Sequence, residues 1–279
     1  MLLLGAIVAD PAAGEEGSAS KMDLYSLLAV FSFILGLMLG SFLNVCIYRI
    51  PLKESIVTPS SKCPHCGQAV RFYDNIPVLS FLFLRGKCRH CGHSISWRYP
   101  FVECLCGFLS FSLYIKYGVD IQYIVYIIFT LALVVVTFID LDHKIIPDII
   151  SLPGVGVGIA VSFLPGTIFW FDSLIGAIAG GGILFLVAVG YERITGRDGM
   201  GGGDIKLLSM IGAWMGWKLL PMILLISSFS GALIGAVFIV FSGKGYRVQI
   251  PFGPFLSAGA VLCLFFGETI LHWYLGLFV

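Results

Sequence analysis

Long apolar runs separated by short polar segments occupy most of the chain. A helix that crosses a bilayer needs about 20 mostly apolar residues, and eight runs approach or exceed this length. They cover residues 24–48, 100–117, 121–140, 148–166, 171–191, 204–217, 218–242 and 250–278. The sixth run is short and is separated from the seventh only at Trp217-Lys218, so a tilted or re-entrant segment is an alternative there. The pattern predicts an all-α polytopic membrane protein with about eight transmembrane helices.

The polar segments divide the chain into four parts. The first residues are apolar, but they are too few to span a membrane and lack the basic flank of a cleaved signal peptide. The sequence that follows them is typical of a flexible linker. We therefore expect a flexible N-terminal extension at 1–20, a first transmembrane helix at 21–48, a polar domain at 49–99 and a transmembrane bundle at 100–279.

Composition and net charge exclude two classes of protein. Hydrophobic residues make up 58% of the chain and charged residues only 12%, which excludes an ordinary soluble protein. The formal net charge of +1 leaves no basic surplus with which to bind a nucleic acid. The expected partner is therefore the lipid bilayer, and no nucleic acid is expected.

Basic residues gather on one side of the predicted helices. Under the eight-helix arrangement, 14 of the 17 lysines and arginines share one side, and eight of these lie in the segment 49–99 alone. The exceptions are Lys21, Lys116 and Lys218. Since loops rich in lysine and arginine stay in the cytoplasm, the segment 49–99 is predicted to be cytoplasmic and both termini to lie outside.

The cytoplasmic segment contains a short repeat of the form K-C-x-H-C-G. Four thiolates suit one tetrahedral zinc ion, and a two-residue spacer lets each pair hold the ion from one tight turn. Gly67 and Gly92 follow the pairs and can take the positive φ that such a turn needs. We expect a structural zinc site in this loop. Its predicted ligands are Cys63, Cys66, Cys88 and Cys91.

A redox role and a disulfide role both fit the cysteine pairs less well than zinc does. A redox dithiol would need a single C-x-x-C at a junction between a strand and a helix, and disulfides are rare on the reducing side of a membrane. His65, His90 and His93 are alternative ligands, but four cysteines already complete the set.

Two carboxylates occupy positions that are energetically unfavourable for a charge. An ionisable group at the edge of a membrane helix is a functional candidate by default. Asp140 directly follows the run 121–139, and Asp204 follows three glycines and opens the sixth predicted helix. The predicted topology places both at the cytoplasmic side, so they can meet. The alternatives are an ion pair between Asp140 and Lys144, and simple helix capping by Asp204.

Two adjacent carboxyl groups can share a proton, so that one takes a proton from water while the other polarises a peptide carbonyl. This is the chemistry of aspartic proteases. The dipole of a helix favours a negative charge at its N-terminus and disfavours one at its C-terminus. Because Asp204 begins a predicted helix and Asp140 ends one, we expect Asp204 to be the anion and Asp140 the neutral acid. Glycine adopts backbone conformations that other residues avoid, and it lets another backbone approach closely. We expect Gly201 and Gly203 to support the site in one of these ways.

Four further polar residues are candidates for supporting roles. Asp142 is most simply a solvated charge at the interface, and Asp148 follows Pro147 and suits the N-cap of the next helix. Asn44 and Glu103 lie in or beside apolar runs. They either line a substrate or cofactor site or form hydrogen bonds between helices.

In order along the chain, these motifs resemble those of the type IV prepilin peptidases, within the GxGD aspartic proteases. The resemblance runs from about residue 36 to 260 and includes the two C-x-x-C pairs. Its other motifs are Gly40-Ser41-Phe42-Leu43-Asn44-Val45, Tyr73-Asp74-Asn75-Ile76-Pro77, Arg98-Tyr99-Pro100 with Glu103, Asp140-Leu141-Asp142, Pro147-Asp148, Gly201-Gly202-Gly203-Asp204 and Pro251-Phe252-Gly253-Pro254-Phe255.

The resemblance implies an enzyme of the bacterial inner membrane with a cytoplasmic active site. It implies cleavage of the leader of a type IV prepilin or pseudopilin by Asp140 and Asp204, followed by methylation of the new N-terminus with S-adenosylmethionine. Gly202 departs from the aromatic residue of many relatives. The residues that would bind S-adenosylmethionine are not predicted. The rival functions are a GxGD intramembrane protease that only cleaves and a proton-coupled transporter.

Overall fold

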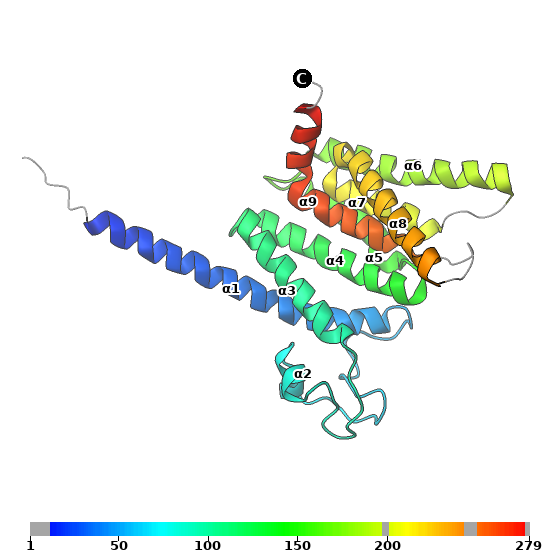
Figure 1. Cartoon of the computed structure of the whole chain (residues 1–279). Coiled ribbons are helices and arrows are strands. Elements are labelled where there is room, and N and C mark those ends of the chain that lie inside the picture. Colours follow the sequence, from blue (N-terminus) through cyan, green and yellow to red (C-terminus); the bar gives the residue numbers. More distant parts are fainter. Residues whose placement is uncertain (1–11, 197–200, 243–249, 277–279) are drawn as a thin grey trace, which may run out of the picture.

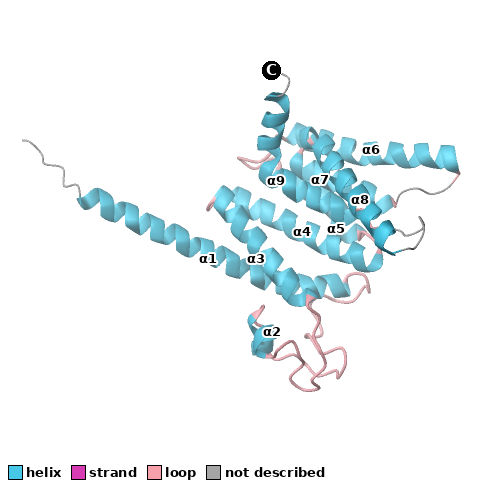
Figure 2. Ribbon diagram, in the orientation of Figure 1, coloured by secondary structure: helices cyan, strands magenta, loops and turns pink. Residues whose placement is uncertain are grey.

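A computed structural model describes residues 12–196, 201–242 and 250–276 (Figure 1). Within these ranges every long element is a helix, and no strand is present (Figure 2). The only β-type pairs there are two isolated bridges in the cysteine loop. The prediction of an all-α protein is therefore confirmed for the described residues.

Four helices are long and apolar enough to cross a membrane. They belong to α1 (Ala12–Arg49), α4 (Ile121–His143), α6 (Trp170–Thr195) and α8 (Leu220–Ser242). The other long helices are α3 (Arg98–Tyr117), α5 (Asp148–Val161), α7 (Gly202–Met215) and α9 (Gly253–Gly276).

The total of eight spans stays a prediction. The helices α5 and α7 have 14 residues each. At 1.5 Å per residue this is about 21 Å, which is shorter than the hydrocarbon core of about 30 Å. The apolar runs 148–166 and 204–217 located these helices, but they did not give all of their ends.

The N-terminal extension differs from the prediction. Residues 12–20 are the first turns of α1 rather than a flexible linker. Alanine and glutamate are strong helix formers and dominate this stretch, so the membrane helix continues through it. Residues 1–11 lie outside the described part of the chain.

Glycines bring two pairs of helices into close contact. A Cβ on Gly36 of α1 would lie 2.5 Å from the backbone oxygen of Cys106 in α3. A Cβ on Gly176 of α6 would lie 2.2 Å from the backbone oxygen of Gly212 in α7. Such contacts are typical of membrane helices, because small residues let two backbones approach.

The helix α4 lies at the centre of the bundle. Its side chains Phe129, Leu133 and Ile139 are buried, as are Leu208 and Ile211 of α7. Figure 1 shows α4 between the pair α1–α3 and the helices α5 and α9. Near its end Ile139 and Asp140 are buried, whereas the final residues Leu141, Asp142 and His143 are exposed.

The cysteine loop forms a separate lobe between α1 and α3 (Figure 1). It contains a short 3₁₀ helix, η1 (Phe72–Asn75), and a single-turn helix, α2 (Leu79–Phe83). A second 3₁₀ helix, η2 (Trp217–Leu219), joins α7 to α8.

Candidate active site and metal centre

Asp140 lies in the last turn of α4 and is 5% exposed. Its Oδ2 atom accepts a hydrogen bond of 3.0 Å from the backbone N–H of Gly253, the first residue of α9. Lys144 forms no ion pair with Asp140. Its backbone N–H instead closes the end of α4 on the Asp140 carbonyl. Asp140 is thus held by the N-terminus of a distant helix.

Asp204 is the third residue of α7 and is half-buried. The N-cap of α7 is Gly201, and no side chain caps it, so the capping alternative for Asp204 is not observed. Gly203, next to Asp204, and Gly253, which binds Asp140, both pack against Ile146, and the two carboxyl groups interact electrostatically. The structure therefore brings together the two carboxylates that the sequence singled out.

Of the three glycines before Asp204, Gly203 lies in a close contact. A Cβ on Gly203 would lie 2.9 Å from the Cβ of Ile146, in the segment between α4 and α5. A Cβ on Gly202 would meet nothing within 4 Å. Neither Gly203 nor Gly201 has a positive φ. The close neighbour of Gly203 is a side chain rather than the backbone that the sequence predicted.

Ile146 contacts both halves of the site. Its Cδ1 atom would lie 3.3 Å from a Cβ on Gly253, next to the N–H that binds Asp140. Gly253 belongs to one of the motifs of the family resemblance, but no role was predicted for it. The sequence feature that could have indicated a role is its place between two prolines, because proline is common at the start of a helix.

Two ion pairs frame the carboxylates. Asp142 pairs with Arg98 at the start of α3, so it is not merely a solvated charge. Asp148 is the first residue of α5, whose N-cap is Pro147, and it pairs with Lys206 of α7 at 2.7 Å. The predicted N-cap role of Asp148 is therefore wrong. The fixed φ of a proline suits a helix entry, and the Asp148 side chain is directed to Lys206 instead.

Asn44 and Glu103 form hydrogen bonds that connect helices to each other and to the cysteine loop. The Asn44 amide donates to the Tyr99 carbonyl at 3.1 Å. The Glu103 carboxylate accepts from the backbone N–H of Val78 at 2.8 Å and from the Ser41 hydroxyl. These contacts agree with the alternative in which both residues form structural hydrogen bonds.

The four predicted cysteine ligands form one cluster. Their Sγ atoms all lie within 4.8 Å of one another, and those of Cys63 and Cys91 are 3.9 Å apart. Tetrahedral zinc with bonds of about 2.3 Å would place its sulfurs about 3.8 Å apart. Gly67 and Gly92 have φ values of 71° and 70°, as the sequence predicted.

The two turns of the cluster repeat each other in detail. The Cys63 N–H donates to the Gln68 carbonyl at 2.9 Å, and the Cys88 N–H donates to the His93 carbonyl at 2.8 Å. Backbone N–H groups of Cys91 and His90 lower the pKa of the Cys88 thiol to about 7. In the same turn, burial and the neighbouring sulfurs raise the pKa of the Cys91 thiol to about 11, so Cys88 is the thiol that ionises first.

An ion pair holds the second turn against η1. The Arg89 guanidinium donates three hydrogen bonds of 2.6–3.1 Å to the Asp74 carboxylate. These hydrogen bonds lower the pKa of Asp74. The guanidinium groups of Arg71 and Arg89 also lie 5.8 and 5.5 Å from the centre of the Tyr73 ring.

The loop also contains a cavity of about 800 Å³. Phe81 and Trp97 form an aromatic wall, with ring centroids 4.7 Å apart, and Trp97 is largely exposed. Arg85 and Lys87 supply positive charge to the same cavity. The lining thus combines an exposed indole ring with two cationic side chains.

Comparisons with known proteins cover nearly the whole chain. Residues 34–117 match the bacterial peptidase A24 N-terminal domain, and residues 127–236 match the type IV leader peptidase family. No solved structure matches the chain.

Curated relatives carry the name prepilin leader peptidase/N-methyltransferase. The protein of Aeromonas hydrophila is 38% identical over 267 residues, which is 87% of this chain and 92% of the relative. That of Pseudomonas putida is 35% identical, covering 89% of this chain and 96% of the relative. The protein of Myxococcus xanthus is 42% identical, and the match covers 78% of this chain and 65% of the relative.

Proposed function

Because the chain belongs to the type IV leader peptidase family, we propose that it cleaves the leader of type IV prepilins or pseudopilins and methylates the new N-terminus. The observation that carries the proposal is the packing of Gly203 and Gly253 against Ile146, which brings the segments of Asp204 and Asp140 to one site. Two interacting carboxyl groups in a largely enclosed site are the chemical requirement for aspartic proteolysis.

The contacts support a division of roles opposite to the one that the sequence suggested. Asp140 accepts an N–H group at the N-terminus of α9, where the helix dipole favours a negative charge. We assign Asp140 as the carboxylate that takes a proton from the attacking water. Asp204 then carries the shared proton and donates a hydrogen bond to the carbonyl of the scissile peptide. The two carboxyl groups titrate as a coupled pair, so this assignment of roles describes the state in which the pair holds one proton.

The site is assigned to the cytoplasmic face of the bacterial inner membrane. The basic loop is expected on that face by the positive-inside rule. The Arg98–Asp142 ion pair supports this orientation, since it joins the end of the loop to the turn of α4 that holds Asp140. The substrate leader would therefore meet the dyad on the cytoplasmic side.

A structural zinc ion is assigned to the cysteine cluster. The spacing of the four sulfurs fits tetrahedral coordination, and the paired turns give each C-x-x-C the same geometry. All four protein ligands are cysteines, so no position is left open for a water or a substrate. The metal would stabilise the loop rather than take part in cleavage.

The methyl donor, S-adenosylmethionine, is assigned to the 800 Å³ cavity of the loop. The exposed face of Trp97 suits stacking by its adenine ring, and Arg85 or Lys87 suits its carboxylate. When bound, the donor supplies an electrophilic methyl group to the free amine of the cleaved product. The protein's part is to hold both molecules in one orientation.

Substitution of each carboxylate tests the protease assignment. Asp140→Asn and Asp204→Asn should each abolish cleavage of a purified prepilin, with retained folding checked by thermal melting. Asp172→Asn is the matched control, because Asp172 lies in another membrane helix and pairs with Lys218 near the far end of α7. Near-normal cleavage by either dyad variant would refute the assignment.

Intact-mass analysis of the product distinguishes the rival functions. A leader peptidase that also methylates gives a shortened product that carries an added methyl group. A protease that only cleaves gives the shortened product alone. A proton-coupled transporter gives neither, and its transport activity should instead depend on the pH gradient across the membrane.

A further inference from the structure

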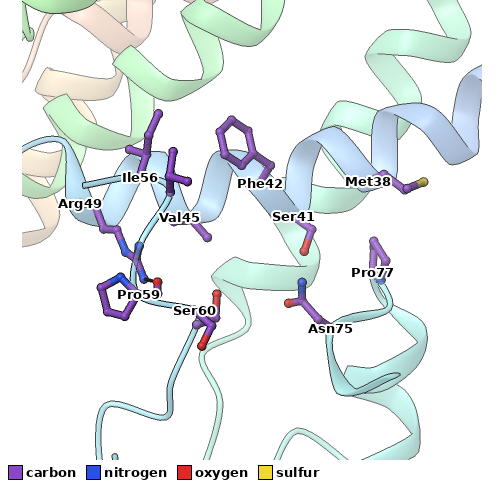
Figure 3. A pocket seen from close by; sticks show the side chains of 12 residues that line it. Met38, Ser41, Phe42, Val45, Arg49, Ile56, Pro59, Ser60, Asn75 and Pro77 are labelled. Atoms are coloured by element: carbon purple, nitrogen blue, oxygen red, sulfur yellow. Dashed lines mark hydrogen bonds between the residues drawn. The ribbon is translucent and has the colours of Figure 1, made fainter. Parts of the chain in front are cut away.

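A second cavity, of about 320 Å³, lies between the end of α1 and the cysteine loop. Figure 3 shows Arg49 and Pro59 at one side of it and Asn75 and Pro77 at the other. The dyad does not contribute to this cavity, and neither does the cysteine cluster. Its volume falls in the range of ordinary ligand sites.

The charge in this cavity is an arginine without a carboxylate partner. Arg49 is only 8% exposed. Its Nη1 and Nη2 atoms donate to the backbone carbonyls of Ser55 and Pro59, both at 2.8 Å. Within the described ranges no acid forms an ion pair with it. A guanidinium has five N–H donors, so Arg49 can accept a further partner, and a buried cation without an anion is costly.

The wall beside Arg49 is a stripe on one face of α1. Met38, Ser41, Phe42, Val45 and Arg49 follow the spacing of a single helical face, and all five line the cavity. Met38 and Phe42 are largely exposed. Apart from Ser41, the stripe is therefore apolar, and it is positive at its end.

The length of the stripe matches one leaflet of a bilayer. Met38 and Arg49 are 11 residues apart, which is about 16 Å along a helix. Half of the hydrocarbon core is about 15 Å. On the loop side, Ile56 and Val57 line the cavity and are exposed, so apolar groups lie on both sides of it.

We infer that this cavity binds the headgroup phosphate of an anionic phospholipid, with Arg49 as its ligand and an acyl chain along the α1 stripe. The described lining contains no aspartate or glutamate, so nothing in it would hold the cation of a zwitterionic headgroup. The lipid is assigned to the cytoplasmic leaflet, and this part alone rests on the proposed orientation.

Lipid titration followed by native mass spectrometry tests the inference. The full-length protein in detergent micelles is titrated with phosphatidylglycerol and, separately, with phosphatidylcholine. We expect one phosphatidylglycerol per chain, bound more tightly than phosphatidylcholine. Arg49→Gln should weaken binding about ten- to hundredfold, the usual effect of losing a hydrogen bond to a charged group. Lys53→Gln is the control, because Lys53 is exposed and does not line the cavity.

A second variant leaves the arginine in place. Ser60→Phe introduces a large side chain from the exposed loop side of the cavity and should weaken phosphatidylglycerol binding with Arg49 intact. Equal binding by wild type, Arg49→Gln and Ser60→Phe would overturn the inference. Displacement of the lipid by inorganic phosphate or by S-adenosylmethionine would also overturn the inference, because either result would show that the cavity binds a small soluble ligand. Cleavage by the same samples is measured separately, so failure of lipid binding is distinguishable from failure of the proposed function.

Discussion

The substitution Gly203→Ala separates contact at the active site from general effects on α7. A Cβ at this position would lie 2.9 Å from the Cβ of Ile146, whereas carbon atoms pack at about 3.5–4.0 Å. The contact involves an atom next to the backbone, so rotation of the Ile146 side chain cannot relieve it. The start of α7 must therefore move by about half an ångström or more, and Asp204 moves with it.

The expected cost follows from the geometry of the dyad. A displacement of about 1 Å in a catalytic site can cost about a hundredfold in rate. We expect Gly203→Ala to lower kcat/KM for prepilin cleavage about ten- to hundredfold, which corresponds to about 1.4–2.7 kcal/mol. The assay is cleavage of a purified prepilin in detergent, with initial rates measured over a range of substrate concentrations.

The neighbouring glycine provides the control. A Cβ on Gly202 would contact nothing within 4 Å, so Gly202→Ala should cleave at close to the wild-type rate. Both variants place an alanine in the first turn of the same helix, so helix propensity changes equally. Equal rates for the two variants, whether both normal or both impaired, would refute the reasoning.

Three further predictions concern the loop and its link to the site. Elemental analysis should find one zinc per chain, and Cys63→Ser with Cys66→Ser should remove it, abolish methylation and lower cleavage only in part, as read from the intact mass of the product. Asp74→Asn should move the midpoint of zinc release on acidification to a higher pH. The lowered pKa of Asp74 means that its ion pair stabilises the loop above about pH 3.9 and is lost only as the pH falls through the folded-state pKa. Arg98→Asp and Asp142→Arg should each lower cleavage about two- to fivefold, and the double exchange should restore part of it, because a partly exposed ion pair contributes up to about 1 kcal/mol.

Much of the local structure was predictable because it depends on neighbouring residues. The turn at each C-x-x-C pair is set by its spacing and by the glycine that follows, and both glycines have the predicted positive φ. The choice of Asp140 and Asp204 used the cost of a charge beside an apolar helix, the glycines before Asp204 and the predicted topology. The structure then placed the two carboxylates within range of each other.

The contacts that join distant segments were not predictable. The hydrogen bond from Gly253 to Asp140 links residues 113 positions apart, and nothing in either local sequence specifies it. The pair Asp148–Lys206 is similar, since each residue also suits a simpler local role. The helical start of α1 was missed for another reason. A polar stretch rich in alanine and glutamate fits both a linker and an exposed helix, and the adjoining membrane helix favours the second.

The close contact between α1 and α3 has a consequence for the order in which the chain assembles during synthesis. Gly36 and Gly40 bring α1 against α3, and the cysteine loop lies between these two helices in the sequence. Every residue that makes these contacts is therefore synthesised before α4. The N-terminal family match, residues 34–117, has nearly the same limits. We expect the unit of α1, the cysteine loop and α3 to fold first and to serve as a template on which the later helices are inserted.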